Sequence, residues 1–161
     1  MGARALVESG LCLLKYYVSL LDLSGGWKLV EKVDTETGAF GWINNIAGTN
    51  DDHPVLMLNL KQYKEETGFP EGLIYKEYLE ALEEVLKNLG GSILWRHPVE
   101  VSPVGQPASE VLAIWYPSYA AFVRLAKREV EGAQECLELR QRAVDFESIV
   151  GISGTEYPMQ P

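Results

Sequence analysis

The order of apolar runs and amphipathic patterns after residue 50 limits the folds open to this chain more than any single motif does. Residues 55–63, 92–101, 110–117 and 145–154 are short apolar runs typical of strands, and residues 72–91, 119–130 and 133–144 repeat apolar positions at helical spacing. The order is strand, helix, strand, strand, helix, strand, with Gly132 interrupting the last helical stretch. This order predicts an α+β domain.

The segment VLAIWYPSYAAF, residues 111–122, joins a predicted strand directly to a predicted helix. Pro117 has no backbone N–H and ends the strand ladder, and Ser118 can accept a hydrogen bond from a free amide in the first helical turn. Gly90 supplies the stop signal of the first helix. The whole pattern predicts the ferredoxin-like β-α-β-β-α-β arrangement, whose helices cover one face of the sheet. The other face stays open and needs a partner, commonly another sheet.

The first fifty residues are predicted to form an extension to this domain. A helical apolar stripe precedes Gly25 and Gly26, and it must be buried either on the main domain or in a subunit contact. Its members are Val7, Leu11, Leu14, Val18 and Leu21. Residues 27–43 contain two short runs around Asp-Thr-Glu-Thr-Gly that predict a hairpin. We therefore expect an extension over 1–50, a ferredoxin-like domain over 51–154 and a tail over 155–161.

Charge and cysteine content argue against several classes of function. The chain has 161 residues and a formal net charge of -9, which disfavours nucleic acid and anionic membranes because both need clustered Lys and Arg. The two cysteines form no C-x-x-C pair and no Cys/His cluster, so we expect no metal site and a reducing, cytoplasmic setting. Charges break the apolar stretches, so no membrane span is expected.

Five short segments, taken in order, resemble a known family. VLMLNLKQYKE, YKEYLEAL, LGGSIL, AIWYPSYAAF and LRQRAV are similar to the domain-of-unknown-function family DUF1330 over roughly residues 53–152. The resemblance implies a dimeric α+β barrel, in which two ferredoxin-like subunits join their sheets and each keeps a cavity between sheet and helices. Relatives with this fold include cofactor-free oxygenases, muconolactone isomerase and haem-degrading monooxygenases. This chain departs from the pattern in its N-terminal extension and in WRHPVEV, where a more glycine-rich segment is usual.

His97 and Asn59 are the residues that we expect to perform any catalysis. Histidine is the usual general base near neutral pH, and the Asn59 amide could polarise a carbonyl or steady an enolate. The alternatives are a partly exposed strand-end position for His97 and an amide that holds a loop backbone for Asn59. Strand alternation places Trp95 and His97 on one face of the sheet and Arg96 on the other.

Five further residues are predicted to bind substrate, namely Trp95, Trp115, Tyr116, Tyr63 and Arg140. Trp115 and Tyr116 end the third strand on opposite faces, so one belongs to the core while the other can contact a flat, apolar ligand. Tyr63 lies near the first strand-to-helix junction, with Tyr75 and Tyr78; their hydroxyls can orient a phenolic substrate, or their rings can seal the helix to the sheet. Arg140 is expected either to pair with Asp145 or Glu147 or to hold a substrate carboxylate.

The leading hypothesis is a homodimeric enzyme that binds a small aromatic or carbonyl-bearing molecule. Its chemistry would be proton transfer, as an isomerase, cyclase or cofactor-free monooxygenase with no metal and no organic cofactor. The chain contains no G-x-S-x-G, Walker or G-x-G-x-x-G motif, which argues against a serine hydrolase, an NTPase and a dinucleotide-dependent oxidoreductase. Two alternatives stay open: a non-catalytic ligand-binding or dimerisation module, and a haem-binding protein with His97 as axial ligand.

Overall fold

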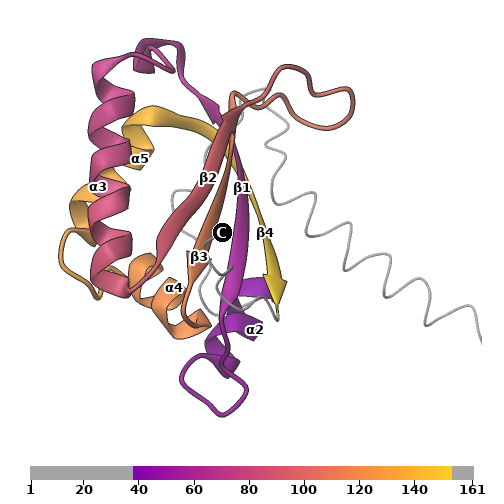
Figure 1. The fold of residues 1–161 in the computed structure, drawn as a ribbon, viewed down its shortest axis with the longest axis vertical. Helices are drawn as coiled ribbons and strands as arrows, with labels where there is room; N and C mark the ends of the chain where they lie inside the picture. Colours follow the sequence, from indigo (N-terminus) through magenta and orange to yellow (C-terminus); the bar gives the residue numbers. More distant parts are fainter. Residues whose placement is uncertain (1–37, 154–161) are drawn as a thin grey trace, which may run out of the picture. The chain divides into compact units, whose positions relative to one another are not determined.

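A computed structural model describes residues 38–153, and these residues belong to one compact unit. The unit is a mixed α+β fold with a four-stranded antiparallel sheet of strand order β2-β3-β1-β4 (Figure 1). The strands are β1 Val55–Tyr63, β2 Ser92–Pro98, β3 Glu110–Tyr116 and β4 Val144–Ser153; the helices are α2 Gly38–Ile46, α3 Leu73–Leu89, α4 Tyr119–Ala126 and α5 Ala133–Ala143, with a short 3₁₀ helix, η1 Glu65–Thr67, after β1. The predicted order of strands and helices is confirmed, with ends that differ by a few residues.

Helix α2 corrects one prediction. The sequence predicts the second arm of a hairpin over residues 39–43, but these residues are helical. The reason is tertiary: Phe40 packs against Phe122 of α4 with ring centroids 5.7 Å apart, and Trp42 meets the ring of Tyr119 edge-on at 5.7 Å. These contacts cross residue 50, where the sequence predicts a domain boundary. The first hairpin arm and the N-terminal apolar stripe lie outside the described residues.

The predicted junction after β3 is confirmed. The strand ends at Tyr116, and the Ser118 hydroxyl accepts a hydrogen bond from the Ala121 amide at 3.1 Å. A second cap comes from the loop before β1, because the Asp52 carboxylate accepts hydrogen bonds from the Tyr119 and Ala120 amides at 2.7 and 3.3 Å. Free amides at a helix start attract such acceptors. The start of α4 is therefore tied to a segment more than sixty residues away in the sequence.

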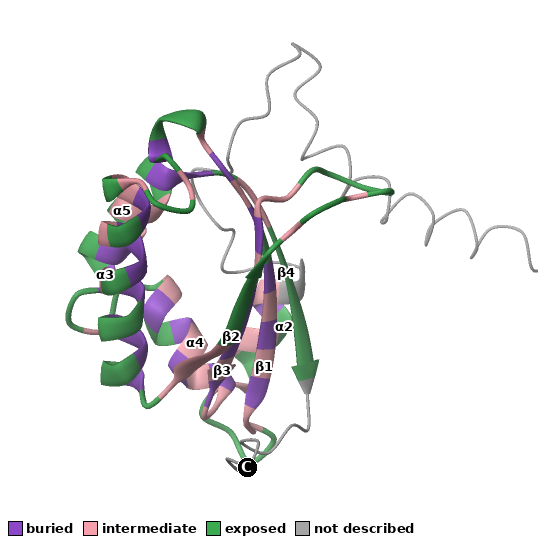
Figure 2. Ribbon diagram, turned by 45° about the horizontal axis from the view of Figure 1, so that its top comes forward, coloured by how far each residue is buried: buried purple, intermediate pink, exposed green. Residues whose placement is uncertain are grey.

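The strand register divides the sheet into two faces. Helices α3, α4 and α5 lie on one side of the sheet (Figure 1), and Figure 2 shows their buried residues turned toward it. We call that side the helix-facing side and the opposite side the open face. The open face consists of Leu56, Leu58, Leu60, Gln62, Ser92, Trp95, His97, Val111, Ala113, Trp115, Phe146, Ser148, Val150 and Ile152.

A bulge in β2 decides which of its side chains reach each face. Ile93 pairs with Ile114, but Trp95 pairs with Ala113, so Leu94 is the extra residue. A one-residue slip moves every later side chain to the other face. The bulge therefore turns Arg96 toward the helices and places Trp95 on the open face.

Candidate functional site

His97 and Asn59 lie on opposite faces of the sheet. Asn59 pairs with Leu112, and Leu112 pairs with Arg96, which places Asn59 on the helix-facing side, where it is 4% exposed. His97 pairs with Val111 on the open face and is exposed. The two residues therefore cannot act together on one ligand within a single chain, because the sheet separates their side chains.

Tyr116 and Asn59 belong to the buried interior. Tyr116 is 3% exposed, and its ring meets Phe122 edge-on with centroids 5.4 Å apart. The Asn59 amide donates a hydrogen bond to the backbone carbonyl of Met57 at 3.1 Å. The acceptor lies in β1 itself, so Asn59 bonds to strand backbone and not to the loop backbone that the sequence leaves open for it. Tyr116 is the core member of the Trp115–Tyr116 pair.

Trp95, His97 and Trp115 share the open face. The rings of Trp95 and His97 lie 6.0 Å apart, and Trp95 is 43% exposed. Trp115 is partly buried and lies directly across from Ser92 at the far end of β2. The sequence predicts Trp95 and Trp115 as substrate-binding residues; the register places both, with His97, on the side of the sheet that α3, α4 and α5 leave uncovered.

Glu110 is a buried carboxylate that accepts hydrogen bonds from three side chains. Tyr63 donates to Oε2 at 2.7 Å, Tyr75 donates to Oε1 at 2.8 Å, and Arg96 reaches Oε1 at 3.3 Å. Arg96 also donates to the Tyr75 hydroxyl. We call these four residues the Glu110 cluster. Glu110 is 2% exposed while the Arg96 side chain is 42% exposed, so the cluster connects the interior to solvent at the β2 edge.

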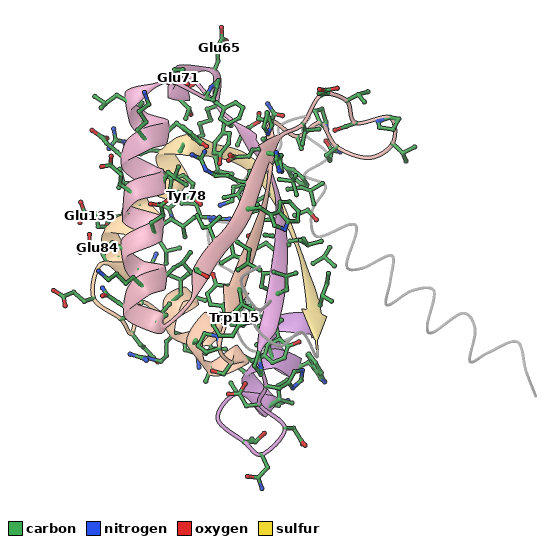
Figure 3. All side chains as sticks on the ribbon, in the orientation of Figure 1. Glu65, Glu71, Tyr78, Glu84, Trp115 and Glu135 are labelled. Carbon is green, nitrogen blue, oxygen red and sulfur yellow. The ribbon has the colours of Figure 1, made fainter. Side chains whose placement is uncertain are left out.

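Glu147 holds a second cluster, which confirms one alternative predicted for Arg140. Lys61 Nζ lies 2.9 Å from Glu147 Oε1, and Arg140 donates to Oε2 through Nε at 2.7 Å and through Nη2. Lys61 also donates to the hydroxyl of Tyr78, which reaches from α3 toward the sheet (Figure 3). The Lys61 and Glu147 side chains are 2% and 4% exposed. We call these four residues the Glu147 cluster.

The two clusters are joined by the strand register. Lys61 on β1 pairs with Glu110 on β3 and with Glu147 on β4, so three charged residues form one row across the sheet. Their charges alternate in sign along the row. Opposite charges at neighbouring positions favour each other most strongly where water is excluded.

The environment fixes the charge states of these groups. Burial would raise the pKa of Glu147, but Lys61 and Arg140 outweigh burial and hold it below its usual value. Burial likewise opposes the charge of Lys61, yet Glu147 raises the Lys61 pKa overall. Burial raises the pKa of Tyr75, and its hydrogen bond to Glu110 acts in the same direction. The carboxylate of Glu147 is therefore ionised, Lys61 is cationic and Tyr75 keeps its proton.

Sequence reasoning missed Lys61 and Glu110. Lys61 stands in the same alternating set as the buried residues Val55, Met57 and Asn59, and that alternation was the available signal. The alternation is hard to see in the sequence, because the neighbouring leucines make both faces of β1 apolar. Glu110 stands at the first position of β3, where a charged residue normally marks a solvated strand end.

The open face carries no Lys, Arg, Asp or Glu among the described strand residues that the register places on it. Its large apolar side chains are nevertheless accessible. The exposed fractions are Leu60 37%, Trp95 43%, Val150 52% and Ile152 39%. Outward charge is carried by the helices instead, as Glu84 and Glu135 show (Figure 3). Large exposed apolar side chains gathered on one face of a sheet are typical of an interaction site.

Residues 38–153 offer neither a metal site nor a membrane span. No group of three or more His, Cys, Asp or Glu side chains there is placed to hold a metal ion. No helix in that range is long and apolar enough to cross a membrane.

Comparisons with known proteins bear on the fold. No family model and no curated protein matches the chain. Among solved structures, the chain is similar to RPA0582, a protein of unknown function from Rhodopseudomonas palustris, with 24% identity and a TM-score of 0.59 over 78% of this chain and 98% of that one. A structure of methylated RPA0582 gives 23% identity and a TM-score of 0.60 over 82% and 98% of the two chains. At this level of identity the likeness establishes the fold alone.

Proposed function

We propose that the protein is a ferredoxin-like subunit that forms a homodimer through the open face, as a dimeric α+β barrel. The observation that supports this is the uncharged, accessible open face described above. Two sheets can pack face to face at about 10 Å with interdigitating side chains, which removes such a surface from water. The proposed role of the domain is assembly, with the open face as its functional surface.

A second copy is the partner that charge favours. The chain carries a net charge of -9, so two copies repel each other unless their contact surfaces are free of charge. The open face meets that requirement, whereas the outer helix faces carry exposed acidic residues such as Glu84 and Glu135. An isologous contact uses the same surface patch on both subunits, and the apolar residues of the open face can form such a patch. The resemblance to DUF1330 points to the same partner.

Sedimentation equilibrium of the full chain and of Val150→Glu tests the dimer. Val150 lies on the open face and is 52% exposed, so a glutamate there should leave the fold intact but place like charges in the contact. We expect a dimer for the wild-type chain and a folded monomer for Val150→Glu. The matched control is Leu73→Glu, because Leu73 is 71% exposed and lies on α3. A monomeric wild-type chain at 100 μM, or dissociation by both variants alike, would contradict the proposal.

A second candidate function is proton-transfer catalysis, now centred on Glu110 in place of His97. The observation that favours it is the Glu110 cluster, in which a buried carboxylate is linked through the Tyr75 hydroxyl to an accessible arginine. A buried carboxylate is a competent general base, and a tyrosine hydroxyl can pass a proton between it and a carbonyl oxygen. Small carbonyl-bearing aromatic molecules are the substrates that this chemistry suits.

Deuterium incorporation tests this candidate without a known substrate. A panel of small aromatic ketones and lactones in D₂O, followed by proton NMR, reports abstraction of a C–H proton. We expect at least one compound to exchange faster with wild-type protein, and Glu110→Gln to slow it roughly a hundredfold or more. Glu84→Gln is the control, since Glu84 is exposed on α3. Exchange at the buffer rate for every compound would remove this candidate.

A further inference from the structure

We propose that His97 is a pH switch for the association of two chains through the open face, which holds at neutral pH and is released in mildly acidic solution. The switch rests on the proposed function, because it acts on the same surface. Three observations support it. His97 is the one ionisable side chain that the register places on the open face among the described strand residues. Its surroundings there are apolar, and no opposite charge lies beside it.

The imidazole of His97 lies within the accessible apolar surface of the open face. His97 pairs with Val111 on β3, and Val111 pairs with Leu60 on β1. The ring centroids of His97 and Trp95 lie 6.0 Å apart. Trp95 and Leu60 are 43% and 37% exposed, and His97 is exposed with them. A second sheet that packs on this face would therefore cover the imidazole together with its apolar neighbours.

The loop after β2 adds further accessible apolar residues next to His97. It covers residues 99–109, and Figure 1 and Figure 2 show it on the side of the sheet away from α3. Val101 and Val104 in this loop are 73% and 90% exposed. Glu100 is its one charged residue; it is exposed and forms no ion pair in the described part of the chain. His97 therefore has accessible apolar residues before and after it in the chain.

No charged group is placed to balance a proton on His97. Among the carboxylates of residues 38–153, none lies within ion-pair distance of its ring. The nearest charged residues of the sheet are Arg96 on β2, Glu110 on β3 and Lys61 on β1, and the register turns all three to the helix-facing side. A second copy brings the same uncharged face. An imidazolium enclosed between two such faces would lose its hydration without gaining a counter-ion.

Histidine titrates in the pH range in which such a switch would operate. An ordinary imidazole is half-protonated at about pH 6.5. In separate chains His97 is exposed and can hold a proton in water, whereas each chain must release that proton to associate. The affinity is therefore complete above the titration range of a free histidine and falls as the pH decreases through it. The net charge of -9 acts in the opposite direction, because acid reduces the repulsion between chains.

Sedimentation equilibrium of the full chain at pH 7.5 and pH 5.5 tests the switch. Because two histidines release their protons, the dissociation constant should rise about a hundredfold between these two pH values. His97→Gln keeps a neutral polar side chain and should limit the rise to less than about threefold, since no side chain of the open face then titrates. His53→Gln is the matched control and should behave like the wild type. His53 is the only other histidine, and its ring contacts Tyr119 at 5.2 Å.

A dimer with equal dissociation constants at both pH values would overturn the switch and leave the dimer in place, and so would an equal loss of affinity in His97→Gln. A wild-type chain that is monomeric at pH 7.5 contradicts the dimer itself, and the switch with it. If His97→Gln prevents association altogether, His97→Phe decides, because its ring cannot titrate and should give a dimer at both pH values. Circular dichroism compares the fold at both pH values; unfolding at pH 5.5 would attribute the loss of affinity to the fold and overturn the switch.

Discussion

The helix-facing side of the sheet is buried and charged, whereas the open face is accessible and uncharged. Lys61, Glu110 and Glu147 lie in one row under α3 and α5, each no more than 4% exposed on its side chain. Leu60 stands next to Lys61 on β1, and it is 37% exposed on the other side. The usual distribution for an isolated domain is the reverse.

The two faces differ in the interactions that they can make. Buried ion pairs gain little stability over apolar packing, but each member depends strongly on its partner, so they fix one arrangement of α3 and α5 on the sheet. Among the described strand residues, the open face carries no Lys, Arg, Asp or Glu, so no ion pair fixes an arrangement there. On the proposed function, one side of the sheet fixes the arrangement within the chain and the other serves association.

The largest expected effect comes from removing one member of the buried row. Lys61→Met leaves Glu147 with Arg140 alone and should lower the free energy of unfolding by about 3 kcal/mol, at the lower end of the range for a broken buried pair. Urea denaturation followed by circular dichroism measures the change. The double variant Lys61→Met, Glu147→Met should be more stable than Lys61→Met, because it also removes the Glu147 carboxylate that the single variant leaves without Lys61. A loss below about 1 kcal/mol for the single variant would mean that the row is hydrated.

Stronger acid should also weaken the fold through the helix-facing side. The pKa of Glu147 is lowered in the folded chain, so its contribution is present above the unfolded value of about 4.3 and is lost as the pH falls through the folded value. Stability should therefore decline below about pH 4. Urea midpoints at pH 7, 4.5 and 3 measure this, and Glu147→Gln should flatten the dependence. An equally steep decline in Glu147→Gln would assign acid sensitivity to other carboxylates.

Removing a single hydroxyl from the Glu110 cluster should have an intermediate effect. Tyr75→Phe deletes the hydroxyl that donates to Glu110 at 2.8 Å and accepts from Arg96. The free energy of unfolding should fall by about 1.5–3 kcal/mol, the range for a hydrogen bond to a charged group. Tyr63→Phe should cost a similar amount, because Tyr63 donates to the other oxygen of the same carboxylate. Equal stability of Tyr75→Phe and wild type would show that water replaces the hydroxyl.

The smallest effect is expected on the open face of a monomer. In the Val150→Glu background, Trp95→Ser removes a side chain that is 43% exposed and should change the free energy of unfolding by less than about 0.5 kcal/mol. In the wild-type background the same substitution should weaken the dimer. A large loss in the free energy of unfolding of the monomer would mean that Trp95 stabilises the single chain. The two faces would then differ less in their contribution to its stability.

The sequence predicts the strands and their order because strand and helix periods differ and because Pro117, Ser118 and Gly90 mark element ends. It does not predict α2, since Phe40 and Trp42 have strand-like spacing and only their contacts with α4 make them helical. The sequence also does not show which side of each strand faces the helices. Alternation alone gives two sets of residues, but which set meets the helices depends on the whole sheet.

The candidate site was predicted less well for the same reason. For Arg140 the sequence leaves open a pairing with Asp145 or Glu147 and a contact with a substrate carboxylate, and the structure shows the pairing with Glu147. Glu110 accepts hydrogen bonds from Tyr63 and Tyr75, which lie 47 and 35 positions away in the sequence. No local sequence pattern predicts contacts between residues so far apart. His97 was predicted to be catalytic because histidine is the usual general base. The bulge at Leu94 places it on the face opposite Asn59.

The donors and acceptors of both clusters come from a single chain, and this has a consequence for the kinetics of assembly. The charged row can form as soon as one chain closes its sheet, without an encounter between two molecules. For the proposed dimer, refolding should then show a first phase whose rate is independent of protein concentration, followed by a second-order phase that buries Trp95 and Trp115. Between these phases the folded subunit exposes its apolar face, so its lifetime in dilute solution sets the time available to chaperones and to unwanted partners.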